Sequence, residues 1–308
     1  MGMALLMAIT IAGCGNSEKE TQQEPEKVED TADGKIEEPA EEPVEGEAQT
    51  ADENEETEIY VFIAKSLSGA MEEIADLYKE THTNVSISYN ADSSGTLQTQ
   101  IEEGFECDLY FSAATKQMTT LNEGGFIESD TIVNLLGNKL CLITYKDSGT
   151  TVTGFADMSN ASNMALADGS VPVGKYTRQL LMNMGVIQTD EGTDPAEIAT
   201  DQVKEALGGI EINECANVGA VAEAVKEGSN EIGTVYYSDA YAVKDYVEII
   251  EEADPSLLGD PICYPVALVK NQEADDAQTA AAKEFYDFLL TNECKDIFLK
   301  YMFTEYSE

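Results

Sequence analysis

The feature that most constrains this fold is a regular alternation of strand-like and helix-like segments from Glu58 onward. EIYVFIA (58–64) is an apolar run of strand length, and the segment SGAMEEIADLYKETH after it places Met71, Ile74 and Tyr78 on one helical face. The alternation continues through NVSISYN, TLQTQIEEG, CDLYFSA, TKQMTTLNEGG and NKLCLITYK. This order predicts a parallel sheet covered by helices.

The same alternation restarts at Asn163, which indicates a second α/β unit built from the middle of the chain. Its segments are NMALAD, GKYTRQLLMNMG, IEINEC, VGAVAEAVKEG and EIGTVYYS. YPVALVK and the helical stretch after it add one more strand and further helices near the end of the chain. A length of 308 residues is sufficient for two medium-sized domains. We therefore predict an α/β protein in which each unit is a mainly parallel sheet flanked by helices.

The N-terminal segment 1–13 is interpreted as a lipoprotein signal peptide. Its apolar run is too short to span a bilayer, and IAGC at 11–14 resembles the bacterial signal in which the cysteine becomes a lipidated N-terminus. The alternative is a generic signal peptide followed by an incidental cysteine. No Lys or Arg precedes the apolar run, so we expect a start codon further upstream. We predict lipid attachment at Cys14 and an extracytoplasmic protein anchored to the cell membrane.

Segment 14–57 is predicted to be a disordered acidic tether. Between Ser17 and Glu58 there are 18 acidic residues and three lysines, with no aromatic residue before the first strand. Such a segment cannot bury enough apolar surface to fold, and its like charges extend it. A metal-binding acidic tract is the alternative. The whole chain has a formal charge of −43, which excludes nucleic acid as a partner because no basic surface exists to displace counterions.

The cysteines after Cys14 are scattered through the alternating region and form no C-x-x-C pair, so a zinc site is not expected. We expect them to be small buried residues, and the sequence does not decide whether any of them pair. They are Cys107, Cys141, Cys215, Cys263 and Cys294.

Four loops that join a strand to a helix carry small or hydroxyl-bearing residues: AKSLSGA, ADSSGT, GSVPVGKY and CANVGAV. In open α/β sheets, ligands bind beyond the carboxyl ends of strands, where helix N-termini point. Free backbone N–H groups and the helix dipole attract anions at such positions. The loops therefore predict an anion site made without cations. The alternative is that Ser66, Ser94 and their neighbours only cap the helices.

A catalytic function is not expected. The only histidine, His82, lies in a predicted helix-to-strand turn, at the end of the sheet opposite the ligand loops. The sequence contains neither a G-x-S-x-G nor a G-x-x-x-x-G-K-[ST] motif. A receptor for another small solute remains an alternative. A carboxylate receptor would use an arginine in the cleft, and the only arginine, Arg178, is expected to be exposed on a helix.

From Glu58 to Phe303, the chain resembles the periplasmic molybdate-binding proteins of ABC-type molybdate importers. The motifs that carry the resemblance occur in the same order: VFIAKSLSGAMEEIADLYKE, SSGTLQTQIEEGFECDLYFSA, LLGNKLCLI, VPVGKYTRQLL, GTVYYSDA and YPVALV. The resemblance implies two hinged lobes, 58–145 plus 262–308 and 146–261, that close on a tetrahedral oxyanion. It also implies a monomer without a cofactor that delivers its ligand to an ABC importer permease.

The resemblance further implies which residues hold molybdate or tungstate. Two serines and a tyrosine would donate from their hydroxyls, and two valines would donate from their backbone N–H groups. These residues are Ser66, Ser94, Tyr236, Val173 and Val218.

Two residues depart from the pattern of the family. Lys65 stands where a small residue is usual, and it either points to solvent or brings a cation to the rim of the site. Asp92 stands where a small or apolar residue is usual, and we expect it to face solvent, since an acceptor inside the site would favour a protonated oxyanion such as phosphate. The choice among molybdate, tungstate and sulfate depends on cavity size, which the sequence does not determine.

Overall fold

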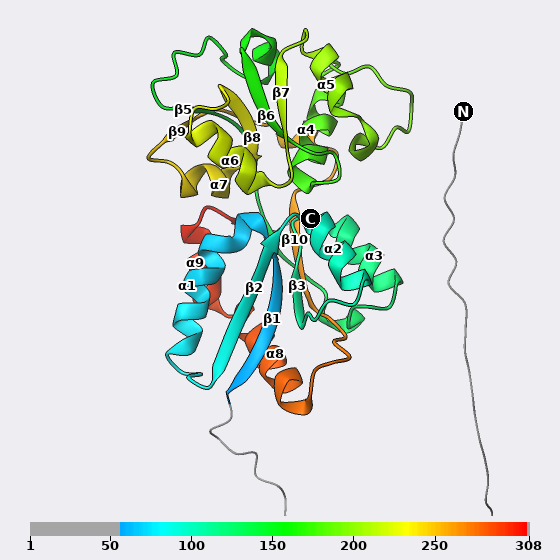
Figure 1. Ribbon diagram of the computed structural model, residues 1–308, viewed down its shortest axis with the longest axis vertical. Coiled ribbons are helices and arrows are strands. Elements are labelled where there is room, and N and C mark those ends of the chain that lie inside the picture. Colours follow the sequence, from blue (N-terminus) through cyan, green and yellow to red (C-terminus); the bar gives the residue numbers. More distant parts are fainter. Residues whose placement is uncertain (1–55, 307–308) are drawn as a thin grey trace, which may run out of the picture. The chain divides into compact units, whose positions relative to one another are not determined.

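The computed structural model describes residues 56–306, which form two β-sheets with helices packed against them (Figure 1). The predicted signal peptide (1–13), the lipidation site Cys14 and nearly all of the predicted tether (14–57) lie outside the described residues. The first strand begins at Thr57, one residue before the predicted start of the folded region.

The first sheet has the strand order β11-β4-β10-β3-β1-β2. Strands β2 and β3 run parallel to β1, whereas β10 is antiparallel to β3 and β4, and β11 is antiparallel to β4. The strands are β1 (Thr57–Ala64), β2 (Val85–Asp92), β3 (Leu109–Phe111), β4 (Val133–Gly137), β10 (Cys263–Leu268) and β11 (Thr304–Glu305).

Helices cover both faces of this sheet because successive residues of β1 point to opposite sides. Ile59, Val61 and Ile63 pack into the cluster that includes α1, α8 and α9, whereas Phe62 packs with α2 and α3 on the other side (Figure 1). The helices are α1 (Ser68–Lys79), α2 (Ser94–Glu102), α3 (Thr115–Glu123), α8 (Asp276–Leu289) and α9 (Asn292–Lys300), with short 3-10 turns η1 (Lys65–Leu67) and η2 (Ser129–Thr131).

The second sheet has the strand order β7-β6-β8-β5-β9. Strand β6 is parallel to β7 and β8, and β5 is antiparallel to β8 and β9. Its strands are β5 (Leu140–Tyr145), β6 (Asn163–Ala167), β7 (Glu211–Cys215), β8 (Ile232–Tyr236) and β9 (Val247–Glu252). Its helices are α4 (Pro172–Asn183), α5 (Thr200–Ala206), α6 (Val218–Lys226) and α7 (Tyr237–Ala242), with 3-10 turns η3 (Phe155–Asn160), η4 (Pro195–Glu197) and η5 (Pro255–Leu257).

The predicted two-lobed α/β class is confirmed, with both sheets mixed rather than mainly parallel. Four of the five antiparallel pairs involve β5 or β10, the strands by which the chain enters one lobe from the other, and the fifth joins β11 to β4. Strand β5 (140–145) was expected in the first lobe, but it pairs with β8 and β9 and so lies in the second. The first crossing segment is therefore 138–139, between β4 and β5, and the second is 253–262, between β9 and β10.

The register of β1 and β2 sets the position of two predicted ligand residues. Ala64, the last residue of β1, pairs with Asp92, the last residue of β2. Because the strands are parallel and end together, Ser66 and Ser94 follow at the same edge of the sheet.

The described residues contain no helix that is both long and apolar enough to cross a bilayer. The five cysteines within them are buried and free, which agrees with their expected role as small core residues. Among these residues, no group of three or more His, Cys, Asp or Glu side chains is placed to hold a metal ion.

Candidate functional site

The predicted ligand residues come together around one small cavity between the two sheets. The space open to the centre of a water-sized sphere is about 10 Å³, far smaller than the roughly 300–1,000 Å³ of typical organic-ligand pockets. The lining includes all five predicted residues: Ser66, Ser94, Val173, Val218 and Tyr236. It is completed by Ala64, Lys65, Asp92, Ser93, Ala113, Val171, Pro172 and Asn217.

Ser94 occupies the first turn of α2 without capping the helix. Ser93 is the N-cap, and its hydroxyl accepts from the Thr96 N–H at 3.2 Å. The Oγ of Ser94 instead accepts from the backbone N–H of Ala113, two residues after β3, at 2.9 Å. That bond uses the acceptor side of the hydroxyl, so the Ser94 proton is left to donate toward the cavity.

Ser66 lies in η1, between β1 and α1, and it also does not cap a helix. Its Oγ lies 2.9 Å from the hydroxyl of Tyr264, the second residue of β10. The capping alternative is therefore excluded for both serines, because neither hydroxyl bonds a backbone N–H of α1 or α2.

Val173 and Val218 contribute backbone groups from two helix N-termini. Val173 is in the first turn of α4, whose N-cap is Val171, and Val218 is the first residue of α6. The first four N–H groups of a helix have no acceptor within the helix, and the helix dipole makes this end attractive to an anion. Gly174 lets α4 begin this close to β6, because a Cβ there would lie 2.1 Å from the carbonyl oxygen of Asp168.

The hydroxyl of Tyr236, at the end of β8, is buried and has no hydrogen-bond partner within residues 56–306. The side chain is 1% exposed and lines the cavity. Burial raises the pKa of Tyr236 well above its usual value, so the hydroxyl keeps its proton. A buried hydroxyl without a partner is disfavoured, so this proton marks a position at which a ligand acceptor would be stabilised.

The two residues that depart from the family pattern both lie at the rim of the cavity. Lys65 is exposed, and its alkyl chain passes over Gly219 of α6, where a Cβ would lie 2.9 Å from the Lys65 Cγ. Asp92 was expected to face solvent, and this was wrong. Its Oδ1 accepts from the Ser93 N–H at 2.7 Å and from the Asn217 Nδ2 across the cavity at 2.9 Å.

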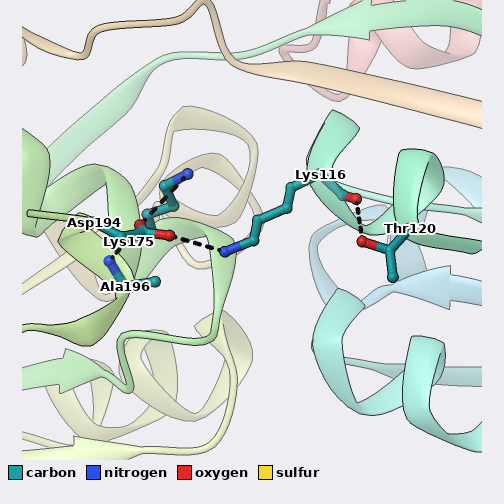
Figure 2. A network of polar contacts seen from close by, with 5 residues as sticks. All are labelled: Lys116, Thr120, Lys175, Asp194 and Ala196. Atoms are coloured by element: carbon teal, nitrogen blue, oxygen red, sulfur yellow. Dashed lines mark hydrogen bonds and ion pairs between the residues drawn. The ribbon is translucent and has the colours of Figure 1, made fainter. Parts of the chain in front are cut away.

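A second cross-lobe contact lies beside the cavity, in a wider groove lined by residues of both lobes. Asp194 precedes η4 and accepts from the Ala196 N–H at 3.0 Å. The same carboxylate pairs with Lys116 of α3 at 3.0 Å and with Lys175 of α4 at 3.9 Å (Figure 2). Both ammonium groups in the groove are thus paired with the Asp194 carboxylate.

The position of Arg178 corrects another expectation. Its side chain is fully buried instead of exposed, and the guanidinium donates to the carbonyl oxygens of Ile198, Ala167 and Gly174 and to Thr200 Oγ1. The guanidinium thus holds the loops around α4 together and does not line the cavity.

His82 lies on the turn before β2, stacked on the ring of Tyr78 at 3.9 Å between ring centroids. Residues 57 and 85 begin β1 and β2, so this turn is at the opposite end of both strands from Ser66 and Ser94.

Four residues around the site were missed at the sequence level: Ala113, Asn138, Asn217 and Tyr264. An asparagine before an apolar helix is a recognisable capping signal, and Asn217 does cap α6 by accepting from the Ala220 N–H at 3.0 Å. No local signal marks the others, because their roles depend on strand neighbours that are distant in sequence.

The site as a whole is a small, nearly neutral cavity that presents hydroxyl and backbone donors. Its lining includes one basic side chain, Lys65, and one carboxylic side chain, Asp92. An arrangement of inward donors without a nucleophile–base pair suits the binding of a small anion.

Comparisons with known proteins agree with this geometry. The model of the bacterial extracellular solute-binding protein family matches residues 59–304. YvgL of Bacillus subtilis, named as an ABC transporter substrate-binding lipoprotein, is 32% identical over 256 residues, covering 83% of this chain and 89% of that protein. The molybdate-binding protein ModA of Escherichia coli K12 is 31% identical over 257 residues, covering 81% and 90%. A solved substrate-binding domain of a molybdenum ABC transporter from Clostridium difficile is 32% identical, with a TM-score of 0.58 and coverage of 82% and 100%. This chain therefore belongs to the bacterial extracellular solute-binding protein family.

Proposed function

We propose that the protein captures molybdate or tungstate, as the dianion, in the cavity between its two lobes. The observation that carries this proposal is the buried Tyr236 hydroxyl, which has no partner within the described residues and lines a cavity formed by helix N-termini. Ser66 and Ser94 would supply two further hydroxyl donors, and Val173 and Val218 would supply backbone donors.

The donor-rich lining favours an oxyanion that carries no proton. At neutral pH, molybdate, tungstate and sulfate accept hydrogen bonds at every oxygen, whereas phosphate retains at least one proton that needs an acceptor. Asp92 is the carboxylate at the rim: its Oδ1 accepts from Ser93 and Asn217, and its Oδ2 is one acceptor set against the several hydroxyl and helix N-terminal donors of the lining. We therefore expect phosphate to bind poorly, and we expect cavity size to separate molybdate and tungstate from the smaller sulfate.

The strongly acidic chain is compatible with anion binding. Charges farther from the ligand than about 8–10 Å are largely screened at physiological salt. Each hydrogen bond to a charged ligand contributes on the order of 1.5–3 kcal/mol, and several of them outweigh the diffuse repulsion. The main effect of the acidic surface is a slower association rate.

The cellular role that we infer is delivery of the oxyanion to the permease of an ABC importer, by a monomer attached to the membrane through lipidated Cys14. The support is the lipoprotein name of the B. subtilis relative, the ModA relatives and the IAGC sequence at 11–14. We infer binding rather than catalysis, because His82 lies at the far end of β1 and β2 from the cavity.

Calorimetric titration of the protein with molybdate, tungstate, sulfate and phosphate, at fixed pH and salt, tests the proposal. We expect a Kd of about 1 μM or tighter for molybdate and tungstate, and binding of phosphate at least about 100-fold weaker. If sulfate or phosphate bound most tightly, that anion would be the ligand and the proposal of molybdate or tungstate would be wrong. Absence of heat with all four anions would refute oxyanion binding.

A further inference from the structure

We propose that Tyr264 and Asn138 are positioning residues that fix the Ser66 hydroxyl as a donor to the bound oxyanion. Neither residue lines the cavity, and both act through Ser66. This inference rests on the proposed oxyanion-binding function. It adds an explanation of why the Ser66 hydroxyl donates to the ligand.

The first step is the orientation of the Asn138 amide. Its Oδ1 accepts from the backbone N–H of Lys139 at 2.9 Å, and exchange of the amide oxygen and nitrogen would put two donors face to face. The Nδ2 group therefore points the other way, toward the Ser238 Oγ at 2.9 Å and the Tyr264 hydroxyl at 3.3 Å. Asn138 thus donates to Tyr264 and cannot accept from it.

The second step is the direction of the Tyr264 hydroxyl. The Tyr264 side chain is fully buried, so its O–H needs an acceptor within the protein. Its hydrogen-bond partners in the described region are the Asn138 Nδ2, which is a donor, and the Ser66 Oγ at 2.9 Å. Only Ser66 can accept, so Tyr264 donates to Ser66.

The third step is the consequence for the ligand. Since the Oγ of Ser66 accepts from Tyr264, its own proton is free to point into the cavity. The Oγ of Ser94 likewise accepts from the Ala113 N–H, which leaves the Ser94 proton free to point into the cavity. Each serine thus has a proton to donate into the cavity, which favours a fully deprotonated oxyanion over one that must donate a proton itself.

This chain of hydrogen bonds also connects the ligand position to both crossing segments. Asn138 lies in the first crossing segment, Tyr264 is the second residue of β10, which follows the second crossing segment, and Ser238 belongs to α7 of the second lobe. The direction of the Ser66 donor therefore depends on a contact that involves both lobes.

The test is the Tyr264→Phe variant, titrated with molybdate and phosphate beside the wild type. The aromatic ring should stay in place, because it packs edge-on against Tyr236 at 5.8 Å and Phe303 at 5.3 Å between centroids. We expect molybdate affinity to fall about tenfold while phosphate affinity is unchanged or rises, since the freed Ser66 hydroxyl can rotate and accept. The selectivity for molybdate over phosphate therefore falls, which a purely structural loss would not produce.

Double-mutant cycles make the test specific. Tyr264→Phe and Ser66→Ala should be non-additive in molybdate affinity, since they remove the same donor, whereas Tyr264→Phe and Ser94→Ala should be additive. Tyr286→Phe is the matched control, because its buried hydroxyl donates to the Thr131 carbonyl at 2.6 Å in the first lobe, and it should leave affinity unchanged.

The outcomes separate the two proposals. If the wild type binds no oxyanion, the proposed function is wrong. If the wild type binds molybdate but Tyr264→Phe binds it equally well with the same selectivity, or if the Ser66 cycle is additive, the positioning role is wrong. Should Tyr264→Phe fail to fold, Asn138→Ala is the variant that decides. Its Tyr264 hydroxyl is less restrained, so we expect a smaller loss of molybdate affinity and a fall in selectivity for molybdate over phosphate.

Discussion

Replacement of Tyr236 by phenylalanine tests the proposed site most directly, because the change removes one hydroxyl and keeps the ring. In the free protein this hydroxyl has no hydrogen-bond partner within the described residues. In the complex it would donate to a dianion inside a closed cavity. The same deletion should therefore have opposite consequences for binding and for stability.

The expected magnitudes follow from those environments. Loss of a hydrogen bond to a charged ligand costs about 1.5–3 kcal/mol, so the Kd for molybdate should rise about ten- to 150-fold. The free energy of unfolding without ligand should stay the same or rise by up to about 1–2 kcal/mol, because a buried hydroxyl without a partner is removed. The ring keeps its edge-on contact with Tyr264, at 5.8 Å between centroids.

Two measurements are needed, calorimetric titration with molybdate and urea unfolding of the ligand-free protein. Tyr286→Phe should show the reverse pattern, since it loses a 2.6 Å hydrogen bond to Thr131 far from the ligand. Its affinity should match that of the wild type, and its free energy of unfolding should fall by about 0.5–1.5 kcal/mol. Wild-type affinity in Tyr236→Phe, or a marked loss of its ligand-free stability, would refute the assigned role of the hydroxyl.

Other variants probe the remaining contacts. Ser94→Ala should weaken molybdate binding about ten- to 100-fold and also lower the free energy of unfolding by about 1–3 kcal/mol, since it leaves the Ala113 N–H unpaired. Ser93→Ala should lower only the free energy of unfolding, by about 0.5–2 kcal/mol, and a comparable loss of affinity would contradict its assignment as a cap. Lys116→Met breaks an exposed pair with Asp194, so molybdate affinity should change less than about fivefold, and the change should vanish in high salt. Burial raises the pKa of Asp239 to about 7, so the folded state binds a proton that the unfolded state has released. The free energy of unfolding of the wild type, relative to Asp239→Asn, should therefore fall as the pH rises from about 4 to about 7 and then level off. A pH-independent difference in urea unfolding would contradict this.

The local pattern of the sequence was sufficient to predict the α/β class and the loops at which the ligand residues lie. Buried strands and amphipathic helices differ in the spacing of their apolar residues, so their alternation is visible without knowledge of distant contacts. Helix N-termini can also be recognised from the local sequence. The serine turns before α1 and α2 and the V-P-x-G turn at α4 all line the cavity. The five ligand residues themselves came from the family resemblance, and their contact with an oxyanion remains a prediction.

Only the tertiary structure decided which donors are available and which residues set them. Arg178 has a polar guanidinium on an amphipathic helix, which predicts exposure, yet carbonyl groups from three separate segments satisfy it in the interior. Strand β5 shows no local preference for either sheet, and its pairing with β8 and β9 is fixed by partners about 90 to 110 residues away. Asp92 binds Asn217, and Ser66 binds Tyr264, across separations of 125 and 198 residues. Hydrogen-bond direction depends on which donors and acceptors the fold brings together. The spacing of residues along the chain does not predict these long-range contacts.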